Sequence, residues 1–171
     1  MNVIVEIDGK KNGLILGVGS NHDFAGCLVK NGRIVQAIEA ERINHLKHSL
    51  SAYNPFHSIL RYLFPSGRAK LQSLATCDTV NPRYFQDLSQ WGEIKRYNHH
   101  LCHAATVAYT STFKASAIFV ADGLGSVWRM KDGSYKYETY TYYKQDQNKI
   151  TEIQKQFGIV DHTLDETHIH Q

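Results

Sequence analysis

Residues 25–42 read AGCLVKNGRIVQAIEAER, and this stretch predicts the first organised part of the fold. Two strand-like runs flank Asn31-Gly32, a pair that readily adopts the positive φ angles of a type I′ turn, so a β-hairpin is predicted. The second run also has a helical composition, but its β-branched residues favour a strand that passes into a turn or helix near Glu41. Just before the hairpin, LILGVGS (residues 14–20) is apolar and contains glycine, as is typical of a buried strand that ends in a loop.

The rest of the chain alternates between strand and helix patterns. NPFHSILRYLF (residues 54–64) has Asn54 as a candidate N-cap and Pro55 as the first helical residue. Further strands are predicted at residues 73–80 and 117–120, a helix capped by Asn98 at residues 99–112, and a strand pair at residues 135–144 and 149–157. This order predicts an α/β fold with a mixed β-sheet and flanking helices. We expect one domain over residues 1–171, with an irregular tail over residues 158–171.

The overall composition is that of a globular protein with no strong bias. Of 171 residues, 42% are hydrophobic and 20% charged, and the formal net charge is +3, which does not favour a nucleic-acid partner. No run approaches the roughly 20 apolar residues that span a bilayer, and the N-terminus lacks the pattern of a signal peptide. The three cysteines form no CxxC pair, which favours reduced thiols and a cytoplasmic location.

A histidine cluster stands out in YNHHLCHAATVAYTSTF (residues 97–113). His99 and His103 are four residues apart, so on a helix they lie on one face and can bind one transition metal. The glutamate of an HExxH motif is absent, which disfavours a zinc peptidase. His100 and Cys102 point away from this face. The alternative is a pair with only a surface or capping role.

A carboxylate that could complete the site occurs in FVADGLGS (residues 119–126), where Asp122 follows a predicted buried strand. Ligands of α/β sheets gather at such strand ends. The alternative is an aspartate that starts a turn before glycine. Two histidines and one carboxylate suit Fe²⁺, Mn²⁺ or Zn²⁺ and leave positions open for substrate oxygens. Gly123 and Gly125 are the candidate cofactor-binding residues.

A second candidate site lies in the loop of GVGSNHDFAGCLV (residues 17–29). Backbone amides in such a slim loop can approach phosphate or carbamoyl oxygens. His22 and Asp23 could move a proton or orient a substrate there, so they are the candidate catalytic residues. The alternative, which the residues alone favour, is a polar hairpin turn in which the side chain of His22 makes its hydrogen bonds within the turn.

Three segments resemble carbamoyltransferases of the NodU/CmcH type. ILGVGSNHDFAGCLVKNGRIVQAIEAERINHLKH (residues 15–48) is similar to the family's opening strand, loop and hairpin, which end in E-E-R-F-x-x-x-K-H. NHHLCHAATVAYTSTF (residues 98–113) resembles HHLAHAASAFYxSPF, and IFVADGLGS (residues 118–126) resembles VDGxGE. The counterparts of the first motif are Glu39, Glu41, Arg42, Lys47 and His48. The three motifs occur in the family's order.

The resemblance implies half of an actin-like ATPase (ASKHA) domain. It also implies transfer of a carbamoyl group from carbamoyl phosphate, through a carbamoyl-adenylate made with ATP, to a hydroxyl of a small molecule. The family's metal ligands correspond to His99, His103 and Asp122, and Fe²⁺ is the expected metal. His22 corresponds to a residue that contacts substrate or transfers a proton.

The chain also departs from the family pattern. Ser126 stands where the family has an acid, and Phe24 is bulkier than its counterpart. Family members are several times longer, and their further parts complete the ATP cleft and make the carbamoyl-adenylate. We therefore expect an N-terminal region, either a fragment or a split subunit completed by a second chain, that is inactive alone. The alternatives are a non-catalytic metal- or nucleotide-binding module, a degenerate remnant, or an α/β domain in which these residues are structural.

Overall fold

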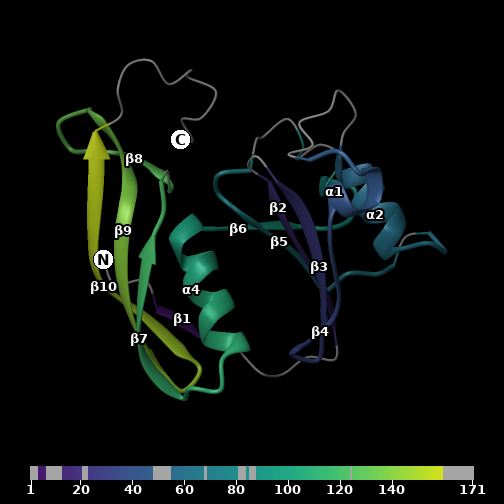
Figure 1. Cartoon of the computed structure of the whole chain (residues 1–171), viewed down its shortest axis with the longest axis horizontal. Coiled ribbons are helices and arrows are strands. Elements are labelled where there is room, and N and C mark those ends of the chain that lie inside the picture. The colour runs from purple at the N-terminus through teal and green to yellow at the C-terminus, as the bar shows by residue number, and fades with distance from the viewer. Residues whose placement is uncertain are drawn as a thin grey trace. The chain divides into compact units, whose positions relative to one another are not determined.

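The computed structural model describes residues 4–6, 13–20, 23–47, 55–67, 69–80, 84, 88–123 and 125–159 (Figure 1). Its helices and strands pack as two compact units. The 9–97 unit contains strands β2 to β6 with helices α1 and α2. The 98–171 unit contains helix α4 and strands β7 to β10, together with β1 from the start of the chain. Each unit has its own β-sheet.

The sheet of the 9–97 unit has the strand order β4-β3-β2-β5-β6. Its strands are β2 (Leu14–Ser20), β3 (Phe24–Lys30), β4 (Arg33–Glu39), β5 (Ser73–Cys77) and β6 (Ile94–Tyr97). The first three run antiparallel, whereas β5 and β6 run parallel to β2, so the sheet is mixed. The φ angles of Asn31 (52°) and Gly32 (73°) are both positive, which confirms the predicted turn between β3 and β4.

Helices α1 (Ala40–Asn44) and α2 (Pro55–Leu63) follow the hairpin. The passage from strand into helix near Glu41 and the start of α2 at Pro55 were both predicted, and the predicted cap Asn54 lies outside the described residues. Helix α2 packs against β3 at Gly26, where a Cβ atom would lie 2.4 Å from Cγ2 of Ile59. Glycine is therefore needed for this close approach.

The sheet of the 98–171 unit is antiparallel, with the order β1-β10-β9-β7 and β8 paired with β9. The elements of this unit are β1 (Ile4–Glu6), α4 (His99–Thr110), β7 (Ala115–Ala121), β8 (Val127–Arg129), β9 (Tyr135–Asp146) and β10 (Lys149–Ile159). Helix α4 lies along one face of this sheet (Figure 1). The shared core comprises Leu101, Ala104, Ala108, Ile118, Val120, Tyr143 and Ile150.

The long β9–β10 pair confirms the predicted strand pair, but its register shifts twice. Ile153 is the extra residue in β10, between the pairs Glu152–Tyr143 and Gln154–Tyr142. Thr139 is the extra residue in β9, between the pairs of Tyr140 and Glu138. Each bulge changes which side chains face α4, because side chains of a regular strand alternate between the two faces.

The observed class is thus the predicted one, an α/β fold with a mixed sheet and flanking helices. Strand β10 continues to Ile159, and the remainder of the predicted tail lies outside the described residues. The prediction of one domain over residues 1–171 stays a prediction. Within the described part of the chain, no helix is long and apolar enough to cross a membrane.

Candidate metal centre

The candidate centre is built on the first turn of helix α4. Asn98 caps this helix as predicted, because its Oδ1 accepts a hydrogen bond of 3.0 Å from the backbone N–H of Leu101. The helix therefore begins at His99, and His103 follows one turn later on the same face. His100 is fully buried on another face, as the helical spacing predicts.

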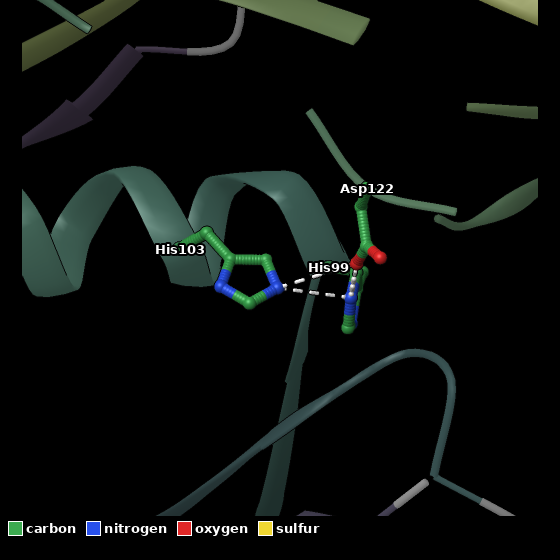
Figure 2. Close-up of side chains that lie close together, drawn as sticks. All are labelled: His99, His103 and Asp122. Atoms are coloured by element: carbon green, nitrogen blue, oxygen red, sulfur yellow. Dashed lines mark hydrogen bonds and ion pairs between the residues drawn. The ribbon is translucent and has the colours of Figure 1, made fainter. Parts of the chain in front are cut away.

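Asp122 follows strand β7 and faces the two histidines (Figure 2). Its Oδ2 lies 2.6 Å from Nε2 of His99 and 3.4 Å from Nε2 of His103. The two Nε2 atoms are 3.1 Å apart, and the three potential ligand atoms all lie within 4.8 Å of one another. The structure therefore brings together the three residues that the sequence singled out as metal ligands.

These separations suit a common metal ligand set. Bonds of about 2.1 Å from a metal to nitrogen or oxygen leave neighbouring ligand atoms roughly 3 Å apart. The imidazole pair meets this spacing, while the shorter contact between His99 and Asp122 is a hydrogen bond that a metal would replace. Two imidazoles and one carboxylate form a donor set that Fe²⁺, Mn²⁺ and Zn²⁺ share.

The electrostatic setting keeps Asp122 ionised. Partial burial raises the pKa of this carboxyl, but the hydrogen bond and charge of His99, the backbone N–H of Gly123 and the charge of His103 outweigh it, so the pKa lies below its usual value. The side chain of His99 is 13% exposed, that of Asp122 is 32% exposed and that of His103 is 54% exposed. The centre is therefore open on the His103 side.

The two predicted cofactor-binding glycines have different surroundings. Gly123 is exposed, and a Cβ atom there would meet nothing within 4 Å. Gly125 is buried, and a Cβ atom there would lie 2.6 Å from Nε2 of His100 and 2.8 Å from Cβ of Glu138. Packing thus explains the glycine at position 125, and the cofactor role of both residues stays a prediction.

The structure describes only one member of the predicted catalytic pair. His22 lies outside the described residues. Asp23 is exposed immediately before strand β3, in the 9–97 unit, whereas the metal centre belongs to the 98–171 unit. The catalytic role of both residues stays a prediction.

A buried polar network behind the histidines was missed in the sequence. The carboxylate of Glu138 is fully buried and accepts hydrogen bonds from Nδ2 of Asn98 (2.7 and 2.9 Å), from Nε1 of Trp128 (2.8 Å) and from the backbone N–H of Ser126 (3.3 Å). It also forms an ion pair with Lys155, whose side chain is 9% exposed. Strict alternation places Glu138 on the exposed face with Tyr140 and Tyr142, and the bulge at Thr139 reverses this.

His100 borders the same network. Its Nδ1 lies 2.7 Å from the hydroxyl of Thr141, whereas its Nε2 has no hydrogen-bond partner among the residues that the structure describes. Burial lowers the pKa of His100, and the nearby charge of Glu138 only partly opposes this. The lowered pKa favours the neutral imidazole. Its Nε2 atom lies next to Gly125, at the position that a Cβ atom would approach.

A segment of the chain is similar in sequence to a known protein. No protein-family model matches the chain. A segment of 56 residues is 38% identical to the uncharacterized protein MJ1058 of Methanocaldococcus jannaschii, and this match covers 29% of the chain but only 9% of that protein.

Two solved structures from Pseudomonas aeruginosa share the fold. One is an uncharacterized protein with similarity to peptidase YeaZ, with a TM-score of 0.51, and the other is YeaZ, with a TM-score of 0.50. Each is 12% identical over 90% of this chain, which covers 71% of the first structure and 72% of the second. The chain thus has an α/β fold of the actin-like ATPase type, and the predicted fold class is confirmed.

Proposed function

We propose that the chain is the N-terminal region of a metal-dependent carbamoyltransferase of the NodU/CmcH type. The complete enzyme would move a carbamoyl group from carbamoyl phosphate, through a carbamoyl-adenylate made with ATP, to a hydroxyl of a small molecule. The observation that carries the proposal is the convergence of His99, His103 and Asp122 at ligand distance. The actin-like fold supports it as well.

In this proposal the three side chains hold a divalent metal, with Fe²⁺ expected from the resemblance and Mn²⁺ or Zn²⁺ also compatible with the donors. A bound metal supplies a Lewis acid for an oxygen of the nucleotide or the acceptor. The lowered pKa of Asp122 keeps its carboxylate ready to bind a cation. The exposed side of His103 leaves a route for substrate oxygens.

Carbamoyl transfer by this chain alone is not expected. A reactive carbamoyl-adenylate must be kept from water, which needs a closed cleft. The chain matches only 9% of the length of its curated relative. We propose that the other walls of the cleft come from further residues of a longer protein or from a second chain.

The metal centre is tested by metal analysis of protein purified without oxygen and loaded with Fe²⁺. We expect one equivalent of metal in the wild type and loss of it in His99→Ala and in His103→Ala. His57→Ala is the matched control, since His57 is an exposed helical histidine of the other unit. A wild-type protein that binds no Fe²⁺, Mn²⁺ or Zn²⁺ would contradict the proposal.

Carbamoyl transfer is tested with labelled carbamoyl phosphate, ATP and a panel of small-molecule hydroxyl acceptors. The assay compares the chain alone with the chain together with the product of the DNA that follows the codon for Gln171. We expect labelled carbamate ester only from the combination. Turnover by the chain alone would refute the need for further parts, and a combination that never forms the ester would refute the proposed activity.

A further inference from the structure

Glu138 is linked to both segments that carry the metal ligands. Through Asn98 it reaches the N-terminus of helix α4, where His99 is the first residue. Through the backbone N–H of Ser126 it reaches the loop that begins at Asp122. Since the carboxylate belongs to β9, an inner strand of the sheet of the 98–171 unit, it is a fixed point to which both ligand-bearing segments are hydrogen-bonded.

Ser126 closes the connection between these two segments. Its hydroxyl oxygen accepts hydrogen bonds from Nδ2 of Asn98 (2.9 Å) and from the backbone N–H of His99 (3.1 Å). The helix N-terminus is therefore bound to the loop directly as well as through the carboxylate. A shift of either segment would break several hydrogen bonds at once, and buried polar groups left without partners are costly.

The charge of the carboxylate is balanced within the network. Lys155 pairs with Glu138 and also lies 3.1 Å from Oε2 of Glu152. Both members of the Glu138–Lys155 pair face the helix because of a bulge, at Thr139 in one strand and at Ile153 in the other. β-Bulges are over-represented next to active sites, where they change the direction of a side chain.

We propose that Glu138 is the positioning residue of the metal centre, which holds His99 and Asp122 at ligand distance through Asn98 and Ser126. This inference rests on the metal site of the proposed function. Glu138 itself does not touch the metal; it acts through the helix cap and the loop. Groups that orient metal ligands from outside the ligand set typically change metal affinity about 10- to 100-fold when they are replaced.

The first test is Co²⁺ affinity, measured from the d–d absorption of the bound ion well below the unfolding temperature. Glu138→Gln keeps the shape of the side chain but turns an NH₂ group toward hydrogen-bond donors, so we expect affinity to fall about 10- to 100-fold. Glu152→Gln removes the other carboxylate near Lys155 and leaves Asn98 and Ser126 untouched, so we expect wild-type affinity. Equal affinities in the two variants would overturn the inference.

The second test is rescue by exchange of donor and acceptor. In Asn98→Asp with Glu138→Gln, the new carboxylate can cap Leu101 and accept from the amide of the new glutamine. We expect the double variant to recover most of the affinity that Glu138→Gln loses, whereas Asn98→Asp alone places two carboxylates together and binds Co²⁺ weakly. A general loss of packing would not be repaired by this exchange, so failure of the rescue counts against the inference.

The third test needs no metal and separates the inference from the proposed function. In metal-free protein, the hydrogen bond between His99 and Asp122 is followed by the ¹H–¹⁵N side-chain signals of His99. We expect this hydrogen bond in the wild type and in Glu152→Gln, and its loss in Glu138→Gln. If the wild type binds no Co²⁺ but this pattern holds, the proposed metal function fails while the positioning role stands. If the hydrogen bond persists in Glu138→Gln, the positioning role fails.

Discussion

Nε2 of His99 lies 2.6 Å from Oδ2 of Asp122, although the two residues are 23 positions apart in the chain. Helix α4 brings one of them and the end of strand β7 brings the other. Without a metal this contact is a hydrogen bond between partly buried groups, and with a metal both atoms become ligands. The same geometry therefore couples metal binding to the stability of the 98–171 unit.

The first prediction concerns this coupling. A ligand that binds only the folded state stabilises it by about 2.7 kcal/mol when its concentration is 100 times its dissociation constant. We expect Co²⁺ at that ratio to raise the free energy of unfolding of the wild type by this amount. Asp122→Asn removes the charged ligand and keeps the size of the side chain, so the same Co²⁺ concentration should have little effect. Denaturant unfolding followed by circular dichroism measures both.

The matched control for Asp122→Asn is Asp146→Asn, at the other end of the sheet, where the side chain is exposed. We expect its response to Co²⁺ to equal that of the wild type. Equal stabilisation of all three proteins would mean that Co²⁺ binds elsewhere, and the assignment of the metal centre would be wrong.

Much of the fold follows from local sequence signals. The Asn31-Gly32 turn, the start of α2 at Pro55 and the cap at Asn98 were predicted because each depends on neighbouring residues alone. The three candidate metal ligands could be singled out in a similar way: helical spacing puts the histidines on one face, Asp122 follows an apolar strand, and the family resemblance links the two segments.

Glu138 could not be found in this way. In a strand of period two it belongs with Tyr140 and Tyr142, whose rings are exposed, and only the extra residue Thr139 turns it inward. In β10 the extra residue Ile153 likewise changes the face of the sheet on which the side chain of Lys155 lies. A bulge arises from the pairing of two whole strands and leaves no short sequence pattern, so the network behind the histidines becomes visible only in the structure.

The second prediction concerns Gly125, the glycine that packs against His100 and Glu138. Gly125→Ala adds a Cβ atom at 2.6 Å from Nε2 of His100 and 2.8 Å from Cβ of Glu138. Overpacking of this kind costs about 1–3 kcal/mol, so we expect a corresponding fall in the free energy of unfolding. Gly123→Ala is the control, because its Cβ would meet nothing within 4 Å. Chemical denaturation of both variants checks the prediction, and equal stabilities would show that the loop is not packed against His100.

The third prediction concerns alkaline pH. Tyr143 is 3% exposed, and burial, followed by the negative charges of Glu152 and Glu138, raises the pKa of its phenol above the usual value near 10. A raised folded-state pKa means that the neutral phenol contributes stability that is fully present below about pH 10 and is lost as the pH rises. The loss is about 1.4 kcal/mol for each pH unit above that point, until the folded-state pKa is reached.

Tyr143→Phe lacks the phenol, so the difference in stability between this variant and the wild type isolates the pH dependence that Tyr143 contributes. At neutral pH the variant loses a buried hydroxyl that lies 3.5 Å from Oδ1 of Asn98, so we expect it to be slightly less stable than the wild type. Above about pH 10 the free energy of unfolding of the wild type falls more steeply than that of the variant. The difference in stability between the two proteins should therefore shrink and then change sign. Urea unfolding at several values between pH 8 and pH 11 measures the difference. Tyr142→Phe, which removes an exposed phenol from the same strand, is measured in parallel as the control for loss of a tyrosine hydroxyl. A constant difference between Tyr143→Phe and the wild type would show that the ring of Tyr143 is solvated in the folded protein.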